Sequence, residues 1–507
     1  MKKLYSMFKL KLEYGQKSYK FHHLCAMLVL PFLIVPGESN AEGEWSTSGF
    51  IRAQSAISTE DGNPNNAALG LETDNDLNLA KGFGVLDMKY VNRFDGSSAI
   101  DKFSFFARAR VNWDMTQSID NGLSPYDAFP AKNRSSLLRV QGDEAAAEIW
   151  EIFADITAGN SWFRFGRQNI VWGEADAIRL LDVVNALDQT QHLFIEAGEQ
   201  FDHIRIPVWA ARGTYRFKSA PHYSLDAYVI PGDFVPTWLP DRGAPFNLRP
   251  FPENVPPTFL EVPPFFIPGL RVEDNVSDRR GDVEGGIRLL GKIGGTQYTL
   301  NYISKIDQDG VLLFDRFDPA AGQVVLKNWH NRVDIFGFST NSFIEPLGAV
   351  LRSELIFTPD QPYADLLTGG TQIIEADTTK FVVGIDRPTF LLNKNRAMSI
   401  SVQWIQTYRD VSKNEISING APADKSETSF SLFLSQPYNN DQIVLEFLGV
   451  YDTDGAYWLQ PAIKYNPGNH WRTSLYGNFF GGSEDRPGRF GSLDWASEIN
   501  VQVTYQF

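Results

Sequence analysis

Residues 498–507, with the sequence EINVQVTYQF, alternate strictly between polar and apolar side chains. The apolar positions are Ile499, Val501, Val503, Tyr505 and Phe507, and a polar residue precedes each of them. A period of two is typical of a β-strand with one apolar and one polar face. The chain therefore ends in a predicted amphipathic strand, whose apolar face needs a partner other than water.

The same alternation recurs along the chain in segments of about ten residues. Between Phe103 and Trp113, for example, only Phe106 breaks the pattern. The pattern predicts about 18 strands, within a range of 16–18, at residues 45–57, 84–92, 103–113, 148–157, 161–172, 209–217, 222–230, 284–290, 297–304, 332–339, 349–357, 380–387, 398–407, 429–435, 442–451, 456–465, 471–478 and 497–507. We expect one all-β domain, because no linker and no long helical stretch interrupts the series.

The connections between these strands fall into two alternating classes. Those after odd-numbered strands are long, such as 114–147, 173–207, 231–282, 309–331 and 359–378, whereas those after even-numbered strands are short. The one exception is the tight turn Asp452–Gly455. The two loop classes indicate that the two ends of the strands lie on different sides of a membrane. This is the arrangement of a transmembrane antiparallel β-barrel with short periplasmic turns and long extracellular loops. A soluble β-sandwich is the competing fold.

The closing strand resembles that of bacterial outer-membrane β-barrels, which also end on an aromatic residue. The resemblance implies that Tyr505 and Phe507 form part of the signal read by the barrel-assembly machinery. It also implies that outer-membrane lipid contacts the apolar side chains while polar ones line the lumen.

The first 41 residues form a predicted signal peptide. Six lysines precede or flank an apolar core at Leu24–Val35, and Ser39-Asn40-Ala41 supplies a small-x-small cleavage site. A single-pass anchor is the alternative, but the apolar run is shorter than the roughly 20 residues that span a bilayer. Residues 42–507 would then form the barrel in the outer membrane, without the only cysteine, Cys25.

The charge of the chain argues against nucleic acid as a partner. Removing residues 1–41 takes away six lysines and two acidic residues, which changes 46 basic and 61 acidic residues to 40 and 59. The net charge is then near −19, and basic surfaces are what nucleic acids require. Aromatic residues make up 13% of the chain, which favours a barrel with interfacial aromatic girdles.

The most distinctive motif lies within residues 162–188. It contains Phe165-Gly166-Arg167-Gln168, then Trp172-Gly173-Glu174, and then Asp182 to Asp188. Together with Asp202–Pro207, it resembles a Gram-negative outer-membrane family catalogued as domain of unknown function 1302. Ala186 stands where proline is expected in many relatives. The resemblance covers roughly residues 145–220 and implies a porin-like barrel associated with transport.

Within this motif, the apolar spacing of Asp176–Leu187 predicts a loop helix, which we expect to fold into the lumen. Arg167, Trp172, Glu174 and Asp176 would then clamp the loop to the wall, or contact solute directly. Strict alternation turns Arg167 towards lipid unless Gly166 carries a bulge.

Inward-facing arginines are the other candidate site. Guanidinium groups bind carboxylates well, so a row of them predicts a path for anionic solutes. The alternative is that they pair with inward acidic residues and only solvate the wall. The six candidates are Arg108, Arg110, Arg164, Arg212, Arg216 and Arg288.

The predicted function is an outer-membrane channel or transporter for small anionic or amphiphilic solutes. An export pore for an anionic polysaccharide is one alternative, and an outer-membrane hydrolase such as a phospholipase is another. The chain carries no nucleophile elbow, His-Glu-x-x-His pair or phosphate loop. We therefore expect no enzymatic activity, no cofactor and no metal site.

Overall fold

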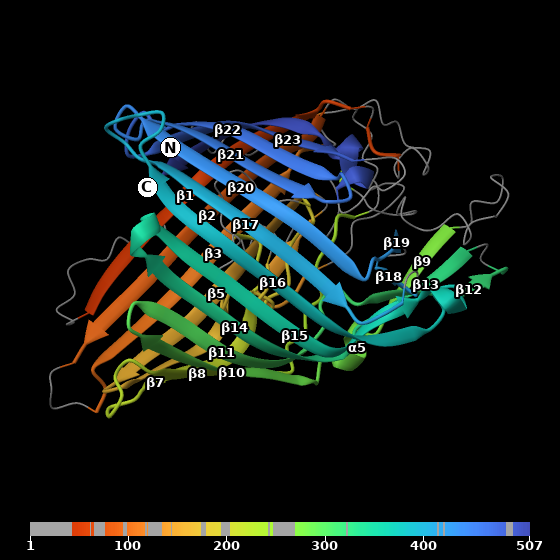
Figure 1. Cartoon of the computed structure of the whole chain (residues 1–507), viewed down its shortest axis with the longest axis horizontal. Coiled ribbons are helices and arrows are strands. Elements are labelled where there is room, and N and C mark those ends of the chain that lie inside the picture. Colours follow the sequence, from red (N-terminus) through yellow and green to blue (C-terminus); the bar gives the residue numbers. More distant parts are fainter. Residues whose placement is uncertain are drawn as a thin grey trace.

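Backbone hydrogen bonds join most of the described residues into one closed antiparallel sheet (Figure 1). The computed structural model describes residues 43–60, 62–64, 77–94, 99–116, 119, 134–142, 144–173, 179–193, 203–241, 244–246, 269–320, 323–412, 415–418, 421–482 and 490–507. The expected signal peptide lies outside these residues. Within them, no helix is long and apolar enough to cross a membrane.

The closed sheet has 21 strands in the described residues. Three of them, β4 (Arg139–Gln141), β18 (Ile416–Ile418) and β19 (Ala421–Pro422), are short and lie outside the ring, which leaves 18. The ring strands are β1 (Gly43–Ser58), β2 (Leu77–Arg93), β3 (Lys102–Asp114), β5 (Ala145–Ala158), β6 (Ser161–Gln168), β7 (Val208–Arg216), β8 (Ser224–Pro231), β10 (Val283–Ile293), β11 (Thr296–Ile306), β14 (Arg332–Ile344), β15 (Ala349–Asp365), β16 (Ile373–Thr389), β17 (Met398–Arg409), β20 (Ser426–Tyr438), β21 (Ile443–Asp452), β22 (Tyr457–Tyr465), β23 (Trp471–Gly481) and β24 (Glu498–Gln506).

The ring closes where β1 pairs with β24, from Phe50 opposite Gln506 to Ser58 opposite Glu498. Gly49 and Phe507 exchange two backbone hydrogen bonds of 3.0 Å just beyond this ladder. Each ring strand thus has a partner on both sides, and the sheet has no free edge to expose to hydrocarbon. The predicted all-β barrel of about 18 strands is confirmed.

The two predicted classes of connection are also confirmed. Short turns such as 159–160 and 294–295 lie at one end of the barrel, together with the start of β1 and the end of β24. The long loops lie at the other end. They carry a second sheet, built from β9 (Gly269–Asp274), β12 (Val311–Asp318) and β13 (Gln323–Trp329), and the short helix α5 (Val276–Arg279) (Figure 1).

This second sheet was not predicted, because its strands lie within segments whose length and composition indicated loops. The loop expected at 359–378 is also shorter than predicted. β15 and β16 continue past a bulge between Thr358 and Gln361, so only residues 366–372 connect them.

The alternation along each strand sorts side chains between the two faces of the wall. On β24, Ile499, Val501, Val503 and Tyr505 are exposed outward, whereas the polar residues between them are buried on the inner face. Large exposed apolar residues are found outward around the ring, such as Ile51, Phe165, Trp209, Leu300, Phe338, Leu355, Trp404, Phe430 and Ile463. This is the inverse of a soluble barrel and fits a wall surrounded by lipid.

We predict that Val501→Arg lowers the free energy of unfolding in lipid vesicles by about 2–4 kcal/mol, because it places a charge on the lipid face near the centre of β24. Val501→Leu, which keeps this face apolar, should change stability by less than about 1.5 kcal/mol. Denaturant titration of the vesicle-inserted protein measures both. Equal stability of the two variants would show that position 501 faces water.

Candidate functional site

The connection between β6 and β7, residues 169–207, turns into the barrel. We call it the inner loop, and its described residues are 169–173, 179–193 and 203–207. In one direction it reaches β16 and β17, where Leu180 packs between Val382 and Ile405. In the other direction it reaches β1 and β2, where the His203 ring lies 5.3 Å from Phe50. A segment inserted between two neighbouring strands therefore crosses much of the barrel interior.

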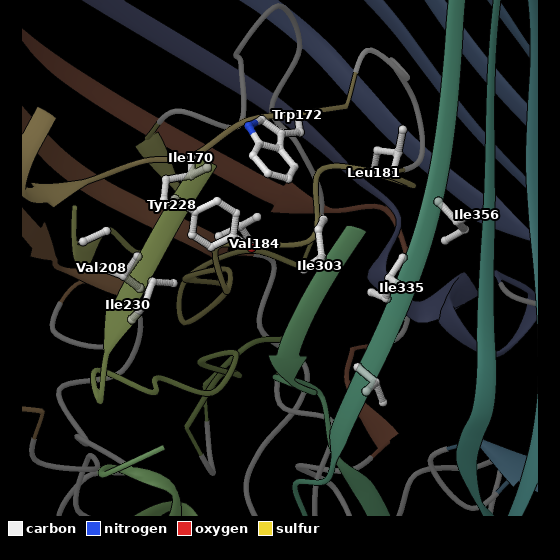
Figure 2. Close-up of a cluster of buried hydrophobic side chains, with 12 residues drawn as sticks. Ile170, Trp172, Leu181, Val184, Val208, Tyr228, Ile230, Ile303, Ile335 and Ile356 are labelled. Atoms are coloured by element: carbon white, nitrogen blue, oxygen red, sulfur yellow. The ribbon is translucent and has the colours of Figure 1, made fainter. Parts of the chain in front are cut away.

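An apolar part of the inner wall lies under this loop. We call it the apolar strip, and its members are buried side chains of β7, β8, β11, β14 and β15, namely Val208, Ala210, Tyr228, Ile230, Ile303, Val333, Ile335 and Ile356. Ile170, Trp172, Leu181 and Val184 of the inner loop pack against it (Figure 2). The expectation of a polar lumen is wrong at the strip, because the loop supplies these inward side chains with an apolar partner.

Two wall glycines make room for the largest of the loop side chains. A Cβ atom on Gly286 of β10 would lie 3.0 Å from the Trp172 indole, and one on Gly337 of β14 would lie 2.2 Å from the Leu181 side chain. Real Cβ atoms essentially never come closer than 3.0 Å to another heavy atom. A side chain at position 337 would therefore displace the Leu181 side chain, and one at position 286 would displace the Tyr228 ring, which lies 2.7 Å from that Cβ, and crowd the indole. Gly286 and Gly337 thus form notches that fix where Trp172 and Leu181 sit.

The wall also binds the loop through polar side chains. The Trp172 indole N–H donates to Asp226 Oδ2 over 3.2 Å. Two wall residues also bind loop backbone groups: Glu354 accepts from the Leu181 N–H (3.1 Å) and Lys305 donates to the Val183 carbonyl (2.5 Å). Gln308, two residues after the end of β11, donates to the Val184 carbonyl (2.6 Å). Backbone groups that are shielded from water in this way need such partners.

These bonds explain why the helix predicted at Asp176–Leu187 is not formed over its described part, residues 179–187. In a helix, the backbone groups of Leu181, Val183 and Val184 would bond to the loop itself. Here these backbone groups are hydrogen-bonded to side chains outside the loop. The predicted position of the loop inside the barrel is confirmed, but the apolar spacing reflects contact with the strip rather than a helical face.

Asn185 joins the beginning and the end of the inner loop. Its Oδ1 accepts from the Ile170 N–H (2.8 Å), and its Nδ2 donates to the Ile206 carbonyl (2.9 Å). The side chain has no exposed surface. Since an amide is one of the few side chains that can both donate and accept in this way, the motif has a structural reason to carry asparagine here.

Buried ion pairs hold the same region, where the beginning and the end of the inner loop meet. We call this region the root of the loop. Arg205 donates to Asp182 Oδ2 from two nitrogens, over 2.9 and 2.6 Å, and Arg179 donates to the same oxygen over 3.1 Å. Asp182 and Arg205 are both buried. Two guanidinium groups therefore compensate one carboxylate, and breaking this cluster would leave charge buried without a partner.

A second buried cluster ties the loop to β3. Arg110 donates to Glu148 over 2.5 Å and to Asp188 over 2.6 Å, while Arg139 donates to Glu148 over 2.6 Å. Burial by itself raises the pKa of the Asp188 carboxyl, but the charges of Arg110 and Arg139 lower it more, so this pKa lies below its ordinary value. Arg110 is therefore a structural anchor of the loop in this conformation.

Arg167 also binds the loop root, through backbone carbonyls. It donates to Ile149 over 2.6 Å and to Pro207 over 3.3 Å. The bulge lies on the neighbouring strand β5, opposite the Arg108/Ala109 step of β3, while Gly166 has a φ of +136°. The predicted strand 161–172 therefore ends at Gln168, where the chain leaves the wall. Glu174 and Asp176 of the predicted clamp lie outside the described residues.

The other candidate arginines, apart from Arg216, are paired with acidic residues on the inner wall. Arg108 donates to Asp87 (2.7 Å) and Glu151 (3.4 Å), Arg164 to Asp155 (2.7 Å), and both Arg212 and Arg288 to Asp226 (2.7 and 2.9 Å). Arg216 is exposed at the end of β7, beside a short turn. Charges of opposite sign thus alternate along this wall.

His192 and Glu498 form a contact that the sequence did not predict. His192 Nε2 lies 2.7 Å from Glu498 Oε1, which also accepts from Asn478 (3.0 Å) and Asn500 (2.6 Å). Both partners are buried. Glu498 is the one acidic residue among the inward positions of β24, a signal that could have singled it out. The pair fixes a second part of the inner loop beside the seam of the barrel.

The predicted assembly residues lie at this seam. The Tyr505 ring packs against that of Trp471, with centroids 5.0 Å apart and an interplanar angle of 58°, and Phe507 is hydrogen-bonded to Gly49 through its backbone. Within the described part of the chain, no group of three or more histidine, cysteine, aspartate or glutamate residues is placed to hold a metal ion.

Comparison with known proteins finds a matching family model and solved structures that are similar to this chain. The model of a family described as "Protein of unknown function (DUF1302)" matches residues 35–507, which confirms the resemblance seen in the motif around Trp172. No curated protein matches the chain.

Among solved structures, the chain is similar to OccK8 (OprE) of Pseudomonas aeruginosa, with 9% identity, a TM-score of 0.49, and 92% of this chain and 98% of that chain covered. It is also similar to OccAB3 of Acinetobacter baumannii, with 10% identity, a TM-score of 0.46, and 92% and 99% covered. A third similar structure is Salmonella typhi OmpF in complex with daunomycin, with 11% identity, a TM-score of 0.43, and 93% and 99% covered.

We predict that Gly337→Ala loosens the inner loop, because the added Cβ would collide with the Leu181 side chain. Amide hydrogen exchange at residues 181–184 should accelerate at least tenfold, measured by mass spectrometry in lipid nanodiscs. Gly84→Ala is the matched control, since a Cβ there meets its nearest atom at 3.9 Å. Unchanged exchange in Gly337→Ala would show that the notch does not position the loop.

Proposed function

Because the chain belongs to the family described as "Protein of unknown function (DUF1302)", whose description assigns no activity, we propose a function from the geometry of the barrel itself. The protein is a channel that carries small solutes across the outer membrane. The inner loop decides which solutes pass.

One observation carries this proposal: a closed ring of 18 strands has an apolar outer face, a largely polar inner face and a loop that crosses its interior. Barrels of 16–18 strands are wide enough to leave an aqueous channel unless something fills them. Here the inner loop occupies part of that width. Because the inner loop narrows the channel, its position would control which solutes pass through the barrel.

The charges on the wall favour a weakly ion-selective channel. Arg108, Arg164, Arg212 and Arg288 bring four positive charges, and their partners Asp87, Glu151, Asp155 and Asp226 bring four negative ones. We call these eight residues the paired band. Its positive and negative charges balance, so it offers anions no net attraction. This balance argues against export of an anionic polysaccharide and leaves small amphiphilic solutes as the class that the site supports best.

We predict that the double variant Leu181→Cys/Gly337→Cys, when oxidised, conducts less in planar lipid bilayers than when reduced. A Cβ on Gly337 would lie 3.5 Å from Leu181 Cγ, the atom whose place the introduced sulfur would take. A small side-chain adjustment would therefore bring the two sulfurs to bonding distance, and the bond would hold the loop on the wall. The only native cysteine is Cys25, in the expected leader. KCl conductance steps that fall on oxidation and return on reduction are the expected result.

The two single-cysteine variants, treated with the same oxidant, control for oxidation elsewhere. Absence of any conductance steps from the wild-type protein would overturn the proposed channel function. Equal conductance of the oxidised and reduced double variant would overturn the controlling role of the inner loop.

We predict that Arg108→Ala shifts ion preference towards cations. Removing the guanidinium leaves Asp87 and Glu151 without their shared positive partner, so the local charge becomes negative. The reversal potential under a tenfold KCl gradient measures the shift. Arg216→Ala, at an exposed arginine outside the paired band, is the control and should cause a smaller change. A shift towards anions in Arg108→Ala would contradict the charge balance described above.

A further inference from the structure

We propose that the apolar strip is a binding site for a small aromatic solute that carries one neutral hydroxyl or carbonyl oxygen, and that the inner loop occupies this site in the structure. The inference rests on the proposed channel function and deepens it, because it names the class of solute.

The strip is apolar, whereas other inward parts of the wall are polar. Its side chains face inward on five strands and are buried by contact with the inner loop. Inward positions of β24, by contrast, carry Asn500, Gln502 and Thr504. Since the ring is already closed by backbone hydrogen bonds, an apolar inner patch adds a surface that a hydrophobic molecule can use.

Tyr228 supplies the polar part of the site. Its ring belongs to the strip, and only 5% of the residue is exposed. Its hydroxyl nevertheless has no hydrogen-bond partner among the described residues. Asp226, two residues earlier on the same face, already accepts from Trp172, Arg212 and Arg288. A buried hydroxyl left unpaired in an apolar surface is suited to a ligand oxygen that arrives with the apolar body.

Trp172 shows the shape of molecule that fits beside Tyr228. Its ring centroid lies 5.0 Å from that of Tyr228, at an interplanar angle of 70°. The indole also reaches the notch at Gly286. A planar group of two fused rings therefore already fills this place, and Figure 2 shows the indole beside the Tyr228 ring. A solute of similar size would replace the Trp172 side chain.

Such an exchange does not require the inner loop to unfold. The root of the loop is held by Asn185 and by the Asp182–Arg205 ion pair. The Trp172 side chain, by contrast, is held by packing, by one hydrogen bond of 3.2 Å to Asp226 and by the Arg288 guanidinium, which lies 5.0 Å from its ring centroid. Rotation of the Trp172 side chain would then free the notch without breaking the bonds that join the two ends of the loop.

The test uses the full-length mature protein in lipid nanodiscs, with 1-naphthol as the probe and naphthalene as the matched probe without oxygen. Binding is measured by probe fluorescence against empty nanodiscs. Trp172→Ala, which empties the notch, should lower the dissociation constant of both probes at least fivefold. Tyr228→Phe, which removes only the hydroxyl, should raise that of 1-naphthol at least fivefold and change that of naphthalene less than twofold.

Folding of both variants is checked by the heat-dependent shift in electrophoretic mobility that folded barrels show. Equal 1-naphthol affinity in Tyr228→Phe and wild type, or weaker binding of both probes to Trp172→Ala, would overturn the inference. KCl conductance of the same preparations separates the two proposals. Conductance without 1-naphthol binding overturns only the solute class, whereas binding without conductance overturns the channel.

Discussion

The structure depends on one constraint: backbone groups inside a membrane have no water to bond to, so every strand needs a partner on each side. Pairing of β1 with β24 meets this requirement for the last two edges. The period of two then follows, because one face of each strand meets lipid and the other meets the interior. The same constraint acts on the inner loop, whose Leu181 and Val183 backbone groups are bound by the wall side chains of Glu354 and Lys305. Closure of the wall and binding of the loop both provide hydrogen-bond partners for backbone groups that are shielded from water.

The inner loop makes part of the barrel resemble the core of a soluble protein. Apolar side chains from the loop and from five strands pack together, while buried ion pairs and Asn185 close the loop at its root. This arrangement accounts for the unusual motif near Trp172. Gly166 allows a positive φ where β6 leaves the wall, Arg167 binds carbonyls on both sides of the opening, and Asp182 and Asp188 compensate buried arginines. The motif therefore describes how a loop is fixed inside a barrel.

Much of the wall could be predicted from the sequence, because alternation and loop length are local properties. The 18 strands and the two loop classes are examples. The interior could not be predicted in the same way. The apolar spacing of Ile178 to Leu187 has a helical period, but contact with the distant residues Lys305 and Glu354 decides the local conformation. The alternation predicted that these arginines face the interior. It could not predict their acidic partners, because those residues lie on other strands. The His192–Glu498 pair spans 306 positions, and no local pattern connects its members.

The two wall glycines also bear on the order in which the chain matures. Gly286 and Gly337 belong to strands that follow the inner loop in sequence, and Glu354 lies 173 positions after Leu181. The loop is synthesised before the surface that receives it. Because contacts between such distant positions form late, docking of the loop must wait until β10–β15 are in register.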